Sequence, residues 1–89
     1  MKLVRISAMW CPACLVMRPI MNEIENTFTN IEHIEYDYDL DEEEVSKYNV
    51  GEILPVFILL DEDKEIKRFV GEKKKEDIIS ELKEYIDEK

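Results

Sequence analysis

The chain of 89 residues has few cysteines, glycines and prolines, with two, two and three of them. So few glycines and prolines, together with 45% hydrophobic residues, exclude a disordered or low-complexity chain. Two cysteines cannot form the several bridges that hold a small secreted domain together. No apolar run approaches the roughly 18 residues of a membrane-spanning helix. We therefore expect one globular domain over residues 1–89 that does not bind a membrane, since a chain of this length can bury only one core.

Cationic residues are also scarce, with 12 Lys and Arg against 22 Asp and Glu and a formal net charge of -10. Binding to nucleic acid or anionic lipid depends on Lys and Arg that neutralise phosphate groups, so neither is an expected partner. The acidic surface favours a soluble monomer. The first residues contain no small-residue cleavage site of the kind that ends a signal peptide. We expect a cytoplasmic location.

The spacing of apolar residues predicts an α/β fold with the element order βαβαββα. Alternation with a period of two predicts strands over residues 2–8, 33–39, 55–60 and 66–70. Helical spacing predicts helices over residues 13–28, 42–48 and 73–89. We expect a kink at Pro19, a cap on the second helix from Asp41, and a hairpin turn over residues 61–65. The strands should form a four-stranded mixed sheet flanked by helices, with the first two parallel and the last two antiparallel.

Both cysteines lie in the stretch MWCPACLVMRP, directly after the first predicted strand. If Cys11 caps the following helix, Pro12 falls in its first turn, where the fixed φ of proline suits a helix. The free N–H groups and the positive end of the helix dipole then stabilise a thiolate at Cys11. Cys14 lies three residues on, on the same helix face, and can form a disulfide with Cys11. This spacing favours thiol–disulfide exchange, with Cys11 as the nucleophile and Cys14 as the resolving cysteine.

Two other interpretations of the cysteine pair remain open. A structural zinc site needs four ligands, and besides the two cysteines the chain offers only His33 and carboxylates. The pair can also be two small buried residues without a chemical role. We expect neither a metal nor an organic cofactor.

The motif WCPAC followed by Pro19, the stretch KYNVGEILPVF and the later Gly71 resemble the thioredoxin family over nearly the whole chain. The resemblance implies a minimal thioredoxin fold in which the bond from Leu54 to Pro55 is cis and lies beside Cys11. It also implies disulfide-containing client proteins and an electron donor of the thioredoxin-reductase type.

Substrate binding is expected at four residues around the cysteines, namely Trp10, Pro12, Leu54 and Pro55. By the resemblance, the backbone of Leu54 is offered to an extended substrate. Large side chains beside a reactive cysteine exclude water, so Trp10 and Met9 are expected to form an exposed apolar rim. A packing role for Trp10 is the alternative.

The dipeptide between the cysteines is ambiguous within the family, because glutaredoxins also place a proline after their first cysteine. The paired glycines with which glutaredoxins hold glutathione are missing, since only Gly71 stands in that region. We therefore expect a thiol–disulfide oxidoreductase that reduces protein disulfides. The alternatives are a glutaredoxin-like enzyme that uses a low-molecular-weight thiol, and a non-catalytic redox-sensing or binding module.

One departure from the family concerns the proton of the resolving cysteine. Thioredoxins typically carry a buried aspartate six residues before the first cysteine, and this position is Arg5 here. The lysine that often accompanies the aspartate corresponds to Glu35. We hypothesise that Arg5 and Glu35 form an enclosed pair and that Glu35 relays the proton from Cys14. A simple ion pair between strands, or two solvated side chains, is the alternative.

Overall fold

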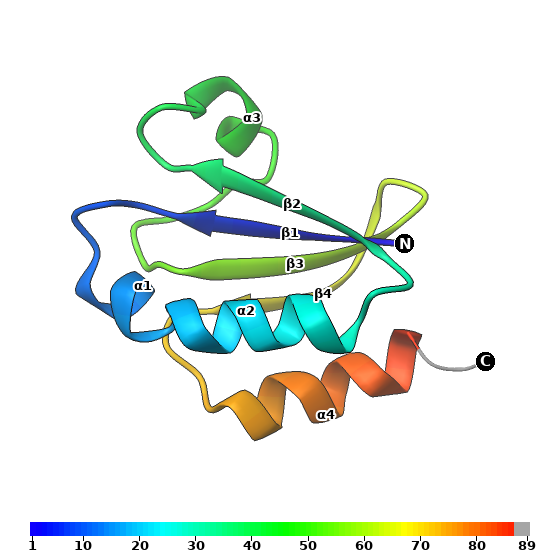
Figure 1. The fold of residues 1–89 in the computed structure, drawn as a ribbon. Helices are drawn as coiled ribbons and strands as arrows, with labels where there is room; N and C mark the ends of the chain where they lie inside the picture. Colours follow the sequence, from blue (N-terminus) through cyan, green and yellow to red (C-terminus); the bar gives the residue numbers. More distant parts are fainter. Residues whose placement is uncertain (87–89) are drawn as a thin grey trace.

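The first strand of the sheet leads directly to the cysteine motif. In the computed structural model, which describes residues 1–86, the strands are β1 (Lys2–Ser7), β2 (Glu32–Asp37), β3 (Val56–Asp61) and β4 (Lys64–Val70). The helices are α1 (Pro12–Val16), α2 (Arg18–Thr27), α3 (Glu42–Ser46) and α4 (Lys75–Ile86). The order βαβαββα is confirmed, with the first helix divided in two (Figure 1).

The four strands form one mixed sheet in the order β2-β1-β3-β4. β1 and β2 are parallel, whereas β1 with β3 and β3 with β4 are antiparallel. These pairings confirm the predicted sheet. The register places Arg5 of β1 directly beside Glu35 of β2.

Two apolar clusters cover the two faces of the sheet, because side chains of a strand point to opposite faces in turn. Leu3 of β1 packs with α2 and α4, which lie together on one side of the sheet (Figure 1). Val4 and Ile6 pack on the other face with Val45 of α3. Cys11 and Cys14 belong to this second cluster. The cysteine motif is therefore held by the core on the α3 face.

The chain bends between α1 and α2 at Met17, whose φ of -89° and ψ of 1° are not helical. Pro19 has no N–H to donate to the carbonyl of Leu15, so the first helix cannot continue through this turn. A second helix begins at Arg18 with Pro19 in its first turn. The predicted kink is confirmed, and it lies two residues before the proline.

Two expectations for the segment from β2 to α3 are wrong in detail. Asp41 occupies the cap position of α3, but its side chain makes no cap hydrogen bond and accepts one from the Asp37 backbone N–H at 2.8 Å. β2 ends at Asp37 instead of Asp39, because the Asp37 carboxylate accepts the N–H groups of Asp39 and Leu40 at 2.9 and 3.0 Å. Such local side-chain bonds compete with the strand ladder.

The predicted hairpin turn between β3 and β4 is confirmed, but it is shorter than the predicted span of residues 61–65. Glu62 and Asp63 form its centre with φ of 55° and 68°, the left-handed pair that a two-residue hairpin of type I′ requires. β4 consequently begins at Lys64. The last helix starts at Lys75, and the part of it predicted over residues 87–89 lies outside the described residues. Among residues 1–86, no helix has the length and apolar character needed to cross a membrane.

Candidate active site

Cys11 lies between the end of β1 and the start of α1, where it caps the helix. Its backbone is extended, with φ of -92° and ψ of 110°, and its sulfur accepts a hydrogen bond from the Cys14 backbone N–H at 3.2 Å. Pro12 occupies the first turn of the helix. The expected cap is confirmed, and it aims the Cys11 sulfur at the free N–H groups of the helix.

Both cysteines are free thiols and nearly enclosed, with 5% of Cys11 and 2% of Cys14 exposed. The Cys11 thiol donates a hydrogen bond to the Leu54 carbonyl oxygen at 3.6 Å. The bond from Leu54 to Pro55 is cis, as the resemblance implied. The Pro55 carbonyl accepts the Gly71 N–H at 2.8 Å, which ties this loop to the end of β4. Segments far apart in the sequence thus meet at Cys11.

Burial raises the pKa of the Cys14 thiol to about 11, and the hydrogen bond with Cys11 contributes in the same direction. Cys14 is therefore a protonated thiol at neutral pH. Because the thiolate is the attacking species in disulfide exchange, an attack by Cys14 would need a group that takes its proton.

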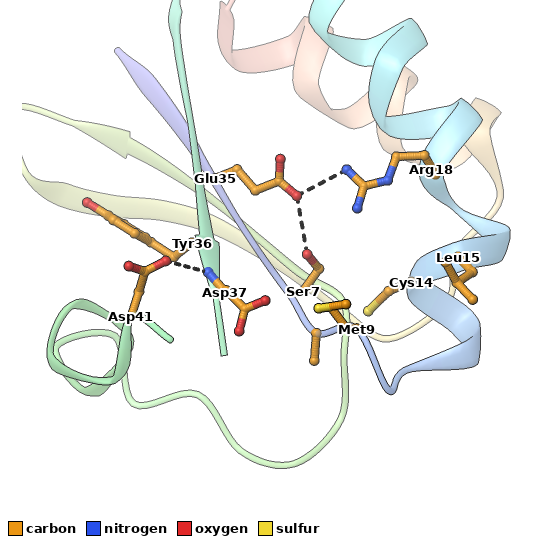
Figure 2. A pocket seen from close by; sticks show the side chains of 10 residues that line it. Ser7, Met9, Cys14, Leu15, Arg18, Glu35, Tyr36, Asp37 and Asp41 are labelled. Atoms are coloured by element: carbon orange, nitrogen blue, oxygen red, sulfur yellow. Dashed lines mark hydrogen bonds and ion pairs between the residues drawn. The ribbon is translucent and has the colours of Figure 1, made fainter. Parts of the chain in front are cut away.

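A cavity of about 380 Å³ opens beside Cys14 (Figure 2). It is lined by Ser7, Ala8, Met9, Cys14, Leu15, Arg18, Glu35, Tyr36, Asp37 and Asp41. Glu35 accepts hydrogen bonds in it from the Ser7 hydroxyl at 3.3 Å and from the Arg18 guanidinium at 3.1 Å. The cavity therefore joins Cys14 to a carboxylate that accepts hydrogen bonds from two of the other lining residues.

The expected pair of Arg5 and Glu35 is present, with 3.4 Å between Arg5 Nη2 and Glu35 Oε1. Only Arg5 is enclosed, since 8% of its side chain and 34% of the Glu35 side chain are exposed. Arg5 also contacts the Met21 carbonyl and the Glu25 carboxylate at 3.4 Å each. It links β1 to α2, whereas Glu35 faces the cavity.

Ser7 and Arg18 were not identified from the sequence. Ser7 shares a side of β1 with Arg5, and Arg18 follows Cys14 by four residues, so both spacings were available as signals. The register of β1 against β2 brings Ser7 to Glu35, and the bend of the chain at Met17 brings Arg18 there.

Trp10 lies at the rim, 56% exposed, with its indole N–H donating to the Asp39 carboxylate at 2.6 Å. Its ring stands edge-on to Tyr38 at a centroid distance of 5.9 Å. Other exposed apolar side chains stand on neighbouring segments, namely Met9, Leu15, Val16, Leu40 and Ile53. Trp10 thus combines partial packing with an exposed face. Its partner Asp39 was missed because it was assigned to a strand.

Across residues 1–86, no three His, Cys, Asp or Glu side chains are grouped as a metal ion would require.

Comparison with known proteins agrees with this geometry. The family model described as Thioredoxin matches residues 1–84. Thioredoxin H2 of Arabidopsis thaliana is 32% identical over 73 residues, which cover 82% of this chain and 54% of that protein. A Thioredoxin H-type protein of Fagopyrum esculentum is 33% identical over 70 residues, covering 79% of this chain and 60% of that protein. The chain thus spans between half and two thirds of the length of these curated relatives.

Solved structures show the same arrangement. The thioredoxin NaTrxh from Nicotiana alata superposes with a TM-score of 0.88 at 27% identity, covering 97% of this chain and 73% of that one. Thioredoxin from Trypanosoma brucei brucei gives a TM-score of 0.86 at 26% identity, with 96% and 74% covered. The fold is a thioredoxin fold, and the chain belongs to the thioredoxin family.

Proposed function

We propose that the protein is a thiol–disulfide oxidoreductase that reduces disulfides of client proteins through a couple of Cys11 and Cys14. The observation that carries this proposal is the contact of the Cys14 N–H with the Cys11 sulfur at 3.2 Å, at the first turn of α1. A sulfur placed there is stabilised as a thiolate by the helix N-terminus. Membership of the thioredoxin family supports the same activity.

The exchange proceeds in two steps. The Cys11 thiolate attacks one sulfur of the client disulfide, and the other client sulfur leaves as a thiolate. Cys14 then attacks the Cys11 sulfur of the mixed disulfide, which forms the bond between Cys11 and Cys14 and releases the second client sulfur. The client gains two electrons and the protein becomes a disulfide. An electron donor of the thioredoxin-reductase type must then reduce that bond.

Client binding is assigned to Trp10, Pro12, Leu54 and Pro55. The Leu54 carbonyl lies within 3.6 Å of the Cys11 sulfur, so an extended segment that bonds to this backbone brings its disulfide to the nucleophile. The exposed face of Trp10 supplies apolar contact area at the same edge. We retain Glu35 as the group that takes the Cys14 proton, with Arg5 behind it.

Residues 1–89 are proposed to act as one domain and as a monomer. The formal charge of -10 opposes close approach of two copies. A reducing compartment such as the cytoplasm suits a dithiol that must be regenerated.

A trapping experiment tests the proposal. A Cys14→Ser variant should retain a disulfide-containing protein as a mixed disulfide that a thiol reductant releases, and Cys11→Ser should retain none. Trapping of glutathione without any protein would favour the glutaredoxin-like alternative. If the wild-type protein shows no turnover of a protein disulfide or a small disulfide, the activity is absent and the binding-module alternative stands.

A further inference from the structure

We propose that Arg18 is a positioning residue for the second step of exchange: it holds Glu35 in the cavity and stabilises the Cys14 thiolate as that thiolate forms. The Arg18 cation thereby stabilises negative charge on both Glu35 and Cys14, the two groups that exchange the proton. The inference rests on the proposed thiol–disulfide exchange and deepens it.

Cys14 needs such help because of where its sulfur lies. Only 2% of the residue is exposed, and it packs in the apolar cluster on the α3 face. A thiolate in these surroundings has lost most of its hydration, and such a charge is costly without a partner. Charged side chains that could offset this cost line the same cavity as Cys14.

Three carboxylates line the cavity, and two of them are engaged by backbone groups. Asp37 accepts two N–H groups of the following turn, and Asp41 accepts the N–H of Asp37 itself. These bonds hold both carboxylates in the connection from β2 to α3. Glu35 differs because its hydrogen-bond donors are all side chains, from Ser7, Arg5 and Arg18. It is the carboxylate best able to exchange partners during a proton transfer.

The charged groups around Glu35 come from three elements. Arg5 of β1 contacts it from the core side, and Glu25 of α2 contacts Arg5 in turn. Asp37 follows on the same strand, and Arg18 of α2 approaches from the cavity side. Among these described neighbours, Arg18 is the cation that shares the cavity lining with Cys14.

Arg18 reaches Glu35 from the helix that follows Cys14. Its Nη1 atom lies 3.1 Å from Glu35 Oε2, and Figure 2 shows the guanidinium extended from α2 across the cavity above Cys14. The positive charge of Arg18 also favours the ionised form of Cys14, and so opposes the effect of burial on the Cys14 pKa. Half of the Arg18 side chain is exposed, which allows it to shift between partners.

The proposed step balances in atoms and charge. The Cys14 proton passes to the Glu35 carboxylate, directly or through water in the cavity. The Cys14 thiolate attacks the Cys11 sulfur, the bond between the two cysteines forms, and the client sulfur leaves as a thiolate that takes up a proton. The negative charge moves from Glu35 to Cys14 while Arg18 faces both.

The reaction of the reduced protein with the neutral disulfide dithiodipyridine separates the two steps. Attack by Cys11 releases a first thiopyridone, and attack by Cys14 on the mixed disulfide releases a second. A stopped-flow instrument follows both releases by absorbance across a range of pH. The variants are Arg18→Gln, Arg18→Lys and Glu35→Gln, with Lys83→Gln as a control that makes the same charge change at an exposed site on α4.

We expect Arg18→Gln to slow the second release by about three- to tenfold at neutral pH, the effect of a half-exposed charge-assisted contact. Its pH profile should move to higher pH, while the first release changes by less than about twofold. Arg18→Lys should keep most of the wild-type rate, because it keeps the charge. Adding Arg18→Gln to Glu35→Gln should slow the second release little further, since the two residues act together.

The outcomes distinguish this inference from the proposed function. If the wild-type protein releases no thiopyridone, the proposed exchange itself is wrong. If it releases both equivalents and Arg18→Gln matches Lys83→Gln in rate and pH profile, the role of Arg18 is wrong and the exchange stands. The role is equally wrong if folded Arg18→Lys is as slow as Arg18→Gln.

Discussion

The backbone N–H of Cys14 donates a hydrogen bond to the sulfur of Cys11 at 3.2 Å. Both cysteines belong to the apolar cluster of the α3 face, but the short helix gives their sulfurs different surroundings. The Cys11 sulfur receives an N–H group at the helix start, whereas Cys14 lines the cavity and burial raises the pKa of its thiol. In the exchange that we propose, Cys11 attacks the client disulfide first, and Cys14 must lose its proton before it attacks Cys11.

The buried Cys14 thiol should make the reduced protein lose stability in alkali. Its pKa rises from 9.0 to about 11 on folding, so the folded state holds the proton more tightly than the unfolded state. The stabilisation is complete below about pH 9 and is lost as the pH rises to about 11, and it amounts to about 2 to 3 kcal/mol. Denaturant unfolding of the reduced protein between pH 8 and pH 11 measures this loss.

A Cys14→Ser variant is the control for the alkaline loss. Burial also raises the pKa of Tyr48, so part of the loss will remain in the variant. The difference between wild type and variant isolates Cys14. Equal slopes in the two proteins would contradict the assignment.

Gly71 should tolerate no side chain. Its φ is +84°, and an added Cβ would lie 3.1 Å from the Ile53 Cγ2 atom. We expect Gly71→Ala to lower the free energy of unfolding by about 1 to 3 kcal/mol, because the backbone is strained. The attack by Cys11 should also slow, because relief of this strain displaces the N–H that holds the Pro55 carbonyl. Unfolding curves and the first thiopyridone release measure the two effects.

Gly51→Ala is the matched control, since a Cβ at Gly51 meets nothing within 4 Å. Its stability should stay within about 1 kcal/mol of the wild type. A loss at Gly51 as large as that at Gly71 would show that the strain argument is wrong.

The order of the elements could be predicted because apolar periodicity is a local property of the sequence. The pairing of Cys11 with Pro12 at a helix start was equally local and is confirmed. Contacts made by polar side chains were predicted less well. Asp41 was expected to cap α3 and instead accepts the Asp37 N–H, because a short carboxylate can satisfy either partner at similar cost.

The group around Glu35 was only half predicted. The Arg5 contact followed from the resemblance, whereas the Ser7 and Arg18 contacts depend on strand register and on where the chain bends at Met17. The spacing of residues along the chain does not determine such contacts between side chains of different elements. The hairpin between β3 and β4 was predicted, but with five turn residues instead of two, because neither Glu62 nor Asp63 is the asparagine or glycine that usually marks a two-residue turn.

The contact of Trp10 with Asp39 should matter for protein clients and little for small disulfides. Asp39→Ala removes the acceptor of the indole N–H at 2.6 Å and frees the ring to move. We expect a rise of about two- to fivefold in the KM for a protein disulfide, with the dithiodipyridine reaction unchanged. Trp10 is the only tryptophan, so a fall in fluorescence anisotropy reports its release. Equal slowing with both substrates would contradict a role at the rim.

Arg5 should contribute more to stability than to the proton transfer. Arg5→Gln removes the buried cation that contacts Met21, Glu25 and Glu35, and we expect a loss of about 1 to 3 kcal/mol in denaturant unfolding. Its second thiopyridone release should keep a pH profile closer to wild type than that of Arg18→Gln. An unchanged stability with a strongly shifted profile would place Arg5 in the relay instead.

Formation of the bond between Cys11 and Cys14 tests the central claim most directly. The protein is equilibrated in buffers of graded thiol and disulfide content, its free thiols are alkylated, and the intramolecular disulfide is quantified by mass. We predict one reversible transition in the reducing range near the thioredoxin value of about -270 mV. If no disulfide between Cys11 and Cys14 forms at any poise, the protein is not an oxidoreductase of this kind.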